Sequence, residues 1–249
     1  MAHTYRTIHH WDQWLEHFLG RNLLEAEQHL LKNSLPKYFG KHILLVGVPK
    51  QYSLLQSSVM PYQCLVTPLP TKIKYPHYIE GNFHELPIHS GSVDLVVLPH
   101  TLEYVDNPQH VLTEACRVVK PEGCILILGF NPYGLWGLRK VFSRKKITPW
   151  SNNFIQANTI KKWLLLSDFE MVNQLNCLYR FPIQNQKLYK KTQFLEGLGR
   201  VCPFLGSVYM VVAKAKVIPL TPIRLRWQQQ LSGIRISTTM TGRIVRNAK

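Results

Sequence analysis

The sequence predicts an α/β fold built around a parallel β-sheet, and three observations support this. Residues 93–98 (VDLVVL) and 124–128 (CILIL) are short, almost uninterrupted apolar runs, as expected of strands buried on both faces of a parallel sheet. Residues 108–119 lie between them and repeat apolar side chains at helical spacing. A strand, a helix and a strand in this order form one βαβ crossover, whose loops lie at the carboxyl end of the sheet, where open α/β folds bind ligands.

The helix of this crossover has recognisable boundary signals. Asp106 or Asn107 can cap its first turn, and Pro108 would be its first residue, where the missing N–H costs nothing. Residues 120–123 (KPEG) have Pro at the second and Gly at the fourth position, which predicts a turn before the second strand.

The rest of the chain supplies further elements on both sides of the crossover. One or two amphipathic helices are expected near the start, followed by three strands; two helices and two strands are expected after the crossover. The predicted strands are residues 41–48, 63–67, 78–81, 169–179 and 207–214, and the predicted helices lie within residues 5–35, 133–142 and 159–166, the last with Asn158 as a possible cap.

Residues 86–123 carry motifs by which the sequence resembles a known family. Leu86-Pro87, Ser92–Val96 (SVDLV) and Glu114–Gly123 (EACRVVKPEG) occur in the order and spacing of the motifs LPF, SFDVV and ExxRVLKPGG. These motifs belong to the class I S-adenosylmethionine-dependent methyltransferases, in particular to their type 11 group. Weaker similarity extends from about residue 40 to residue 215.

The resemblance implies a Rossmann-like, seven-stranded, mostly parallel sheet with an N-terminal helical cap and an antiparallel last strand beside the sixth. It also implies methyl transfer from the cofactor's sulfonium to a nucleophile. The expected segments are a helical cap over residues 1–40, a methyltransferase-like domain over residues 41–216 and a basic, flexible tail over residues 217–249. Residues 180–205 would connect the last two strands as a flap on the acceptor side.

The turn after the first predicted strand departs from the family pattern hhDhGxGxG. Gly47 matches the first glycine, whereas Leu45 stands at the usual acid and Pro49 and Gln51 stand at the second and third glycines. Proline cannot donate a backbone N–H, and glutamine brings a Cβ where a nucleotide-type ligand approaches the backbone closely. With the missing ribose acid described next, these changes predict a cofactor affinity roughly two to three orders of magnitude below that of a well-formed site.

The candidate cofactor-binding residues follow the first, third and fourth strands. Residues 66–68 (VTP) offer no carboxylate for ribose hydroxyls after the second strand. After the third strand, the Asn82 amide oxygen can accept from the adenine amino group and Phe83 can pack on the ring. The expected cofactor is S-adenosyl-L-methionine, and the residues expected to bind it are Gly47, Asn82, Phe83, Pro99 and His100.

His100 and Glu103 are the expected catalytic residues, because they follow the fourth strand, where members of the family contact cofactor or acceptor. Methyl transfer depends mainly on alignment and desolvation of the reactants, so a strong base is not required. Each residue also has a structural interpretation: His100 as a histidine bonded to loop backbone, and Glu103 as a solvated charge at a helix end. No set of side chains completes a metal site, so none is predicted.

Positive charge is concentrated in the C-terminal half of the chain. The 249 residues carry a formal net charge of +16. Residues 1–122 hold ten Lys and Arg against eleven Asp and Glu, whereas residues 123–249 hold twenty against three. Two interpretations are open: an anionic partner, either nucleic acid or a membrane surface, or a solubilising surface with a flexible tail.

The composition favours a cytoplasmic protein. No apolar run approaches the ~20 residues of a membrane helix, and the first residues have no apolar signal core. The five cysteines are odd in number and form no CxxC motif, which indicates free thiols in a reducing compartment.

Three functional hypotheses follow. The leading one is an S-adenosylmethionine-dependent methyltransferase with an unidentified acceptor, for which a small molecule is favoured. The second is a catalytically inactive, methyltransferase-like binding or scaffold protein with an anionic partner, suggested by the altered first turn and the basic half. The third is a nucleic-acid methyltransferase guided by the basic half, although Asn131-Pro132-Tyr133 follows the fifth strand, whereas an NPPY-type tetrad would follow the fourth.

Overall fold

The computed structural model describes residues 2–70, 77–142, 153–184 and 202–217, together with positions 186, 189, 192 and 197. The chain divides into two units, Met1–Val217 and Ile218–Lys249, and the second lies outside the described residues. The predicted basic tail beyond Val217 and most of the predicted flap over residues 180–205 therefore lie outside them as well. In the part that is described, no helix is both long and apolar enough to cross a membrane.

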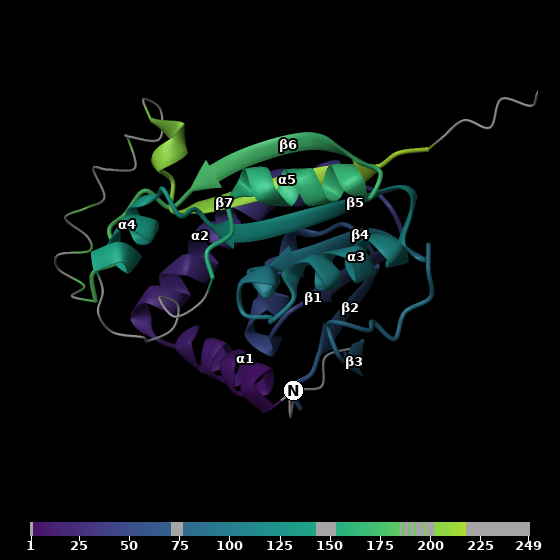
Figure 1. Cartoon of the computed structure of the whole chain (residues 1–249), viewed down its shortest axis with the longest axis horizontal. Helices are drawn as coiled ribbons and strands as arrows, with labels where there is room; N and C mark the ends of the chain where they lie inside the picture. The colour runs from purple at the N-terminus through teal and green to yellow at the C-terminus, as the bar shows by residue number, and fades with distance from the viewer. Residues whose placement is uncertain are drawn as a thin grey trace, which may run out of the picture. The chain divides into compact units, whose positions relative to one another are not determined.

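A seven-stranded sheet forms the centre of the first unit (Figure 1). The strands from β3 to β5 are parallel, and β7 runs antiparallel between β5 and β6. This confirms the predicted Rossmann-like sheet, including its antiparallel last strand. In spatial order the strands are β3 (Tyr78–Glu80), β2 (Tyr62–Thr67), β1 (His42–Val46), β4 (Val93–Pro99), β5 (Val119–Phe130), β7 (Val208–Ala215) and β6 (Phe169–Cys177).

The helices of the described residues cover both faces and one end of this sheet. They confirm the predicted amphipathic segments, including two helices within residues 5–35. They are α1 (Ala2–Trp14), α2 (Phe18–Ser34), α3 (Pro108–Val118), α4 (Leu135–Phe142) and α5 (Ala157–Leu166), with the 3-10 helices η1 (Leu35–Lys37), η2 (Pro49–Ser57), η3 (Thr101–Glu103) and η5 (Pro203–Leu205).

Two apolar clusters fill the two faces of the sheet, because alternate side chains of a strand point to opposite faces. The cluster around Val96 contains buried residues of α3 and α5, which Figure 1 shows on the same side of the sheet. The cluster around Leu95 contains buried residues of α2 and η2 on the other side. Helices on both faces explain why the central strands β1 and β4 are apolar along almost their whole length, as the sequence of β4 indicated.

The crossover between β4 and β5 forms as predicted, with one adjustment. Asn107, and not Asp106, caps α3: its Oδ1 accepts from the backbone N–H of His110 at 3.2 Å. The predicted turn at residues 120–123 lies within β5 as an irregularity, with a shift of register against β4 and a positive φ of 64° at Glu122. The strand is therefore longer than the predicted residues 124–128.

Asp94 lies inside the apolar sequence of β4 and has a structural role at the amino end of the sheet. Its Oδ2 accepts from the backbone N–H groups of Lys41 and His42 at 3.0 and 2.9 Å. Lys120 Nζ donates to both of its carboxylate oxygens at 2.9 Å. These bonds connect β1, β4 and β5 at the end opposite to the one where this fold binds ligands.

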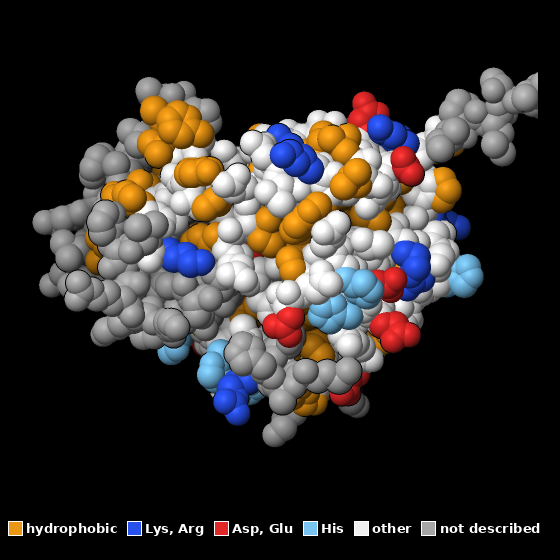
Figure 2. Space-filling view, in the orientation of Figure 1, with side chains coloured by type: hydrophobic (Ala, Val, Ile, Leu, Met, Phe, Trp, Pro, Cys, Tyr) orange, Lys and Arg blue, Asp and Glu red, His pale blue; other side chains and the backbone are white. Residues whose placement is uncertain are grey.

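The predicted cap of α5 is wrong. The helix begins at Ala157 with Gln156 as its N-cap residue, so Asn158 lies inside the first turn. On the face of the molecule in Figure 2, acidic and basic side chains are interspersed among the described residues. Two runs of basic residues in the C-terminal half, residues 144–146 and 190–191, lie outside the described residues.

Candidate functional site

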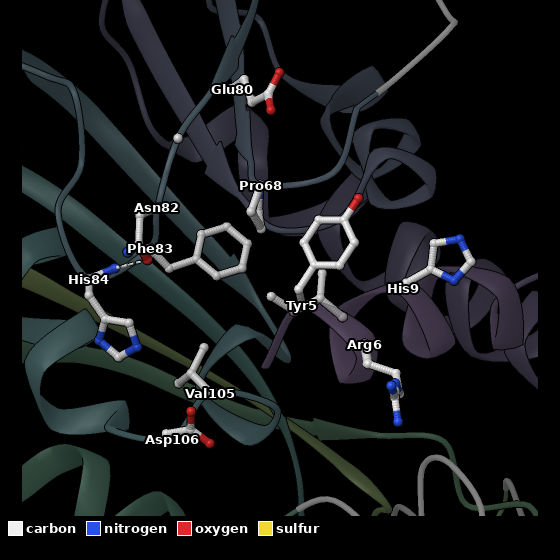
Figure 3. Close-up of a pocket in the computed structure, with 12 residues that line it drawn as sticks. Tyr5, Arg6, His9, Pro68, Glu80, Asn82, Phe83, His84, Val105 and Asp106 are labelled. Carbon is white, nitrogen blue, oxygen red and sulfur yellow. Dashed lines mark hydrogen bonds between the residues drawn. The ribbon is translucent and has the colours of Figure 1, made fainter. Parts of the chain in front are cut away.

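A cavity of about 1160 Å³ lies between α1 and the residues that follow β2, β3 and β4 (Figure 3). Its volume is slightly above the roughly 300–1,000 Å³ that is typical of small-molecule sites. Residues after β3 and β4 form one wall, and Tyr5, Arg6, Ile8 and His9 of α1 form the facing wall. This is the end of the sheet where open α/β folds bind ligands, so the cavity is the candidate site.

Asn82 and Phe83, two of the predicted cofactor-binding residues, line this cavity. Phe83 is almost fully buried, with its ring centroid 6.3 Å from that of Tyr104. Asn82 is exposed, and its Oδ1 accepts from the backbone N–H of His84 at 3.1 Å. A carbonyl oxygen has two lone pairs, so this oxygen retains one acceptor position, and the amide nitrogen donates to none of the residues that the structure describes.

The turn after β1 is filled by the side chain of Gln51, which stands at the third glycine position of the family pattern. Gln51 is fully buried; its Oε1 accepts from the backbone N–H of Val48 at 3.1 Å, and its Nε2 donates to the carbonyl of Pro99 at 2.9 Å. A Cβ added to Gly47 would lie 2.6 Å from Gln51 Oε1. The glutamine side chain therefore fills the space between the ends of β1 and β4.

Helix α1 covers the same region from outside. Trp11 is fully buried, with its ring centroid 5.5 Å from that of His100 and 6.0 Å from that of Phe130. Lys50 holds the helix in place: its Nζ lies 2.8 Å from Asp12 Oδ2 and 3.0 Å from Glu16 Oε1. Within the described part of the chain, Gly47, Pro99 and His100 are consequently absent from the cavity wall, although they were predicted to bind the cofactor.

His100 and Glu103, the predicted catalytic residues, form a buried cluster with Glu27 of α2. His100 Nδ1 lies 2.9 Å from Glu103 Oε2, and Nε2 lies 2.5 Å from Glu27 Oε1. Glu103 Oε1 also accepts from the backbone N–H of Phe130. The interpretation of Glu103 as a solvated charge is wrong, since only 3% of it is exposed, and His100 is bonded to carboxylates and not to loop backbone.

The cluster keeps His100 protonated. Burial alone lowers the pKa of its imidazole, but the carboxylates of Glu27 and Glu103 outweigh burial and raise this pKa to about 10. Both ring nitrogens then donate to carboxylates, so the ring has no free lone pair in this arrangement. The catalytic roles of His100 and Glu103 stay a prediction, which requires the cluster to open.

Stability is expected to fall as the pH rises above 6.5, because His100 loses its proton in the unfolded chain before it does so in the folded protein. The contribution of protonated His100 to the free energy of unfolding is complete below pH 6.5. It is lost as the pH rises toward 10, at up to about 1.4 kcal/mol per pH unit. Urea unfolding between pH 6.5 and 8 measures the slope, and the NMR signal of the imidazole should remain that of the protonated ring at pH 8. A deprotonated His100 in the folded protein at pH 7.5 would contradict this expectation.

Comparisons with known proteins agree with this architecture. Residues 64–127 match the family model described as a methyltransferase domain. The uncharacterized protein YafS of Escherichia coli K12 is 26% identical over 211 residues, which cover 84% of this chain and 83% of that protein. The ubiquinone/menaquinone biosynthesis C-methyltransferase UbiE of Vibrio parahaemolyticus is 25% identical over 133 residues, which cover 53% of this chain and 46% of that protein.

The solved structures show the same fold. A methyltransferase from Thermotoga maritima, described as a possible histamine N-methyltransferase, has a TM-score of 0.65 at 17% identity, covering 87% of this chain and all of that one. A putative methyltransferase of Bacillus halodurans has a TM-score of 0.54 at 15% identity, covering 76% of this chain and 99% of that one. The chain therefore combines the fold of the class I S-adenosylmethionine-dependent methyltransferases with the sequence motifs of their type 11 group.

Proposed function

We propose that this protein is an S-adenosylmethionine-dependent methyltransferase that acts on a small-molecule acceptor. The observation that carries the proposal is the cavity at the carboxyl end of the sheet, with Asn82 and Phe83 in its wall. Its size and the wall that α1 adds to it suit a nucleoside and a small acceptor better than a polymer. The anionic partner predicted for the basic half, nucleic acid or a membrane surface, stays a separate prediction.

The wall of the cavity fits the adenosine part of the cofactor. The free donors and remaining acceptor position of the Asn82 amide match the edge of adenine, and Phe83 offers an apolar surface beside it. The cofactor supplies an electrophilic methyl group on a sulfonium. The chain's own contribution is to hold the reactants in line and to exclude water, and α1 serves both purposes as one wall of the cavity.

The methionine part of the cofactor does not fit the arrangement beside Gly47. Gln51 fills this space: a Cβ at Gly47 would meet its Oε1. The complete cofactor therefore requires the Gln51 side chain to leave its bonds to Val48 and Pro99. The loss of these two hydrogen bonds is one physical reason for the weak cofactor affinity that the altered turn predicts.

The same observation supports a second candidate function. If Gln51 stays in place, the cavity accepts the adenosine part alone, and the protein binds an adenine nucleoside without transferring a methyl group. This corresponds to the inactive, methyltransferase-like binding protein among the sequence hypotheses. The two candidates differ in whether the methionine part of the ligand adds to affinity.

Isothermal titration with S-adenosylhomocysteine and with adenosine tests both candidates. Tighter binding of S-adenosylhomocysteine supports the enzyme, equal binding of both ligands supports the nucleoside-binding protein, and no binding of either at millimolar concentration contradicts both. Asn82→Ala should weaken either ligand about five- to tenfold through lost hydrogen bonds. Gln109→Ala removes an exposed amide of α3 that is not part of the wall, and it should leave both affinities unchanged.

A further inference from the structure

We propose that Glu80 binds the 2′- and 3′-hydroxyls of the ribose in this cavity, in place of the acid that the end of β2 lacks. The inference rests on the proposed function, since it assigns one residue of the same site. It also narrows the ligand class to ribonucleosides in which both hydroxyls are free.

Among the described residues, the end of β2 offers the cavity no side-chain acceptor. Thr67 is fully buried, and its Oγ1 accepts from the backbone N–H of Leu69 at 3.3 Å. The carbonyl of Leu69 in turn accepts from the hydroxyl of Tyr78 at 2.8 Å. These bonds hold the segment after β2 against β3, and Pro68, its contribution to the cavity wall, has no polar side-chain atom.

Glu80 lies one strand further along the same edge of the sheet. It is the last residue of β3 and stands in parallel register with Thr67, so its position relative to the carboxyl end is the same. Its side chain lines the cavity and is exposed. It has no hydrogen bond or ion pair to any residue that the structure describes, so its carboxylate is available to a ligand.

The other residues of the cavity wall indicate where the adenine and the ribose would lie. Figure 3 shows Glu80 at one end of the cavity, with Asn82 and Phe83 further along the same wall. Asp106, the other carboxylate of the wall, lies beyond them beside Val105 (Figure 3). An adenine held at Asn82 and Phe83 lies between these two carboxylates, and Glu80 is the one that stands beside the end of β2, where this fold holds the ribose.

A carboxylate is suited to a vicinal diol because its two oxygens accept from two neighbouring hydroxyls at once. Such charge-assisted bonds are roughly twice as strong as neutral ones. Nucleotide-binding α/β folds use an acid for the ribose in the same way, usually one that follows the second strand of the unit. Here the chain supplies the same chemistry from β3.

Adenosine and 2′,3′-dideoxyadenosine test this assignment without any need for activity. Isothermal titration of the wild type should show adenosine binding about tenfold more tightly than the dideoxy compound. Glu80→Gln should lower the affinity for adenosine about tenfold and leave the affinity for 2′,3′-dideoxyadenosine unchanged. The two compounds should then bind the variant with equal affinity. Glu85→Gln is the matched control: Glu85 is an exposed carboxylate five residues along the chain, it is not in the cavity wall, and its loss should change neither affinity.

Two results overturn the assignment while leaving the proposed function intact: unchanged adenosine affinity in Glu80→Gln, or an equal loss for both compounds. A third result, in which the wild type binds neither adenosine nor S-adenosylhomocysteine, overturns the proposed function and this assignment with it. A thermal unfolding curve of Glu80→Gln that matches the wild type excludes misfolding as the cause of a loss.

Discussion

Replacing Glu27 with alanine is expected to lower the free energy of unfolding by about 3–5 kcal/mol. The change leaves the protonated ring of His100 with only one carboxylate in a region from which water is excluded. It also removes the bond that joins α2 to the end of β4. Folded domains have total stabilities of roughly 5–15 kcal/mol, so a large part of the protein's stability depends on this residue.

Urea unfolding at pH 7 measures this loss. Glu25→Ala is the control, because Glu25 is exposed on the same helix, and its replacement should change stability by less than about 0.5 kcal/mol. Glu27→Gln keeps an acceptor for His100, so its loss of unfolding free energy should lie between those of Glu27→Ala and Glu25→Ala. If the free energy of unfolding of Glu27→Ala lay within about 1 kcal/mol of the wild-type value, His100, Glu27 and Glu103 would not form the ion pair described above.

Replacing Gln51 with glycine is expected to raise the affinity for S-adenosylhomocysteine about 10- to 100-fold, which corresponds to roughly 1.4–2.8 kcal/mol. The change empties the space beside Gly47 and restores the third glycine of the family pattern. The affinity for adenosine should stay the same, because Asn82 and Phe83 are untouched. The free protein should lose about 1–3 kcal/mol of stability, since the N–H of Val48 loses its partner and the carbonyl of Pro99 keeps only the hydroxyl of Thr101 at 3.4 Å.

Titration of both ligands into both proteins separates these effects. Gln56→Gly is the control, because Gln56 is exposed in the same 3-10 helix and carries the same loss of a side chain without opening the turn. A Gln51→Gly protein that binds S-adenosylhomocysteine no better than the wild type would show that Gln51 is not the barrier to the methionine part. An equal gain for adenosine would point to a general loosening of the site.

The central strands were predictable because β1, β4 and most of β5 are buried on both faces, and an apolar run such as residues 93–98 is typical of such a strand. The outer strands β3 and β6 are partly exposed. The crossover helix was predictable from its cap and its spacing. The closed first turn was predictable only in part. Proline and glutamine at the glycine positions indicated a poor site, but not that Gln51 would bond to the carbonyl of Pro99, 48 positions away in the chain.

The buried cluster was missed, although the sequence contains a signal for it. Glu27 lies four residues after Leu23 and four before Leu31, so it falls on the apolar face of α2, where an unpaired charge is costly. A charge in that position requires a buried partner, and His100 is the partner. The walls of the cavity were harder to predict, because Tyr5 and Arg6 reach it through the placement of α1, which local patterns do not specify.

The order of the strands has a consequence for how the protein is made. The penultimate position in the sheet belongs to β7, the last of its strands in the sequence, so β5 and β6 have no common neighbour until Val208–Ala215 leaves the ribosome. Until then β5 presents an apolar open edge, and β6 has no partner strand at all. Contacts between strands so distant in sequence form slowly, and the nascent chain is most exposed to aggregation in this interval. The arrangement makes β7 the strand that completes the sheet.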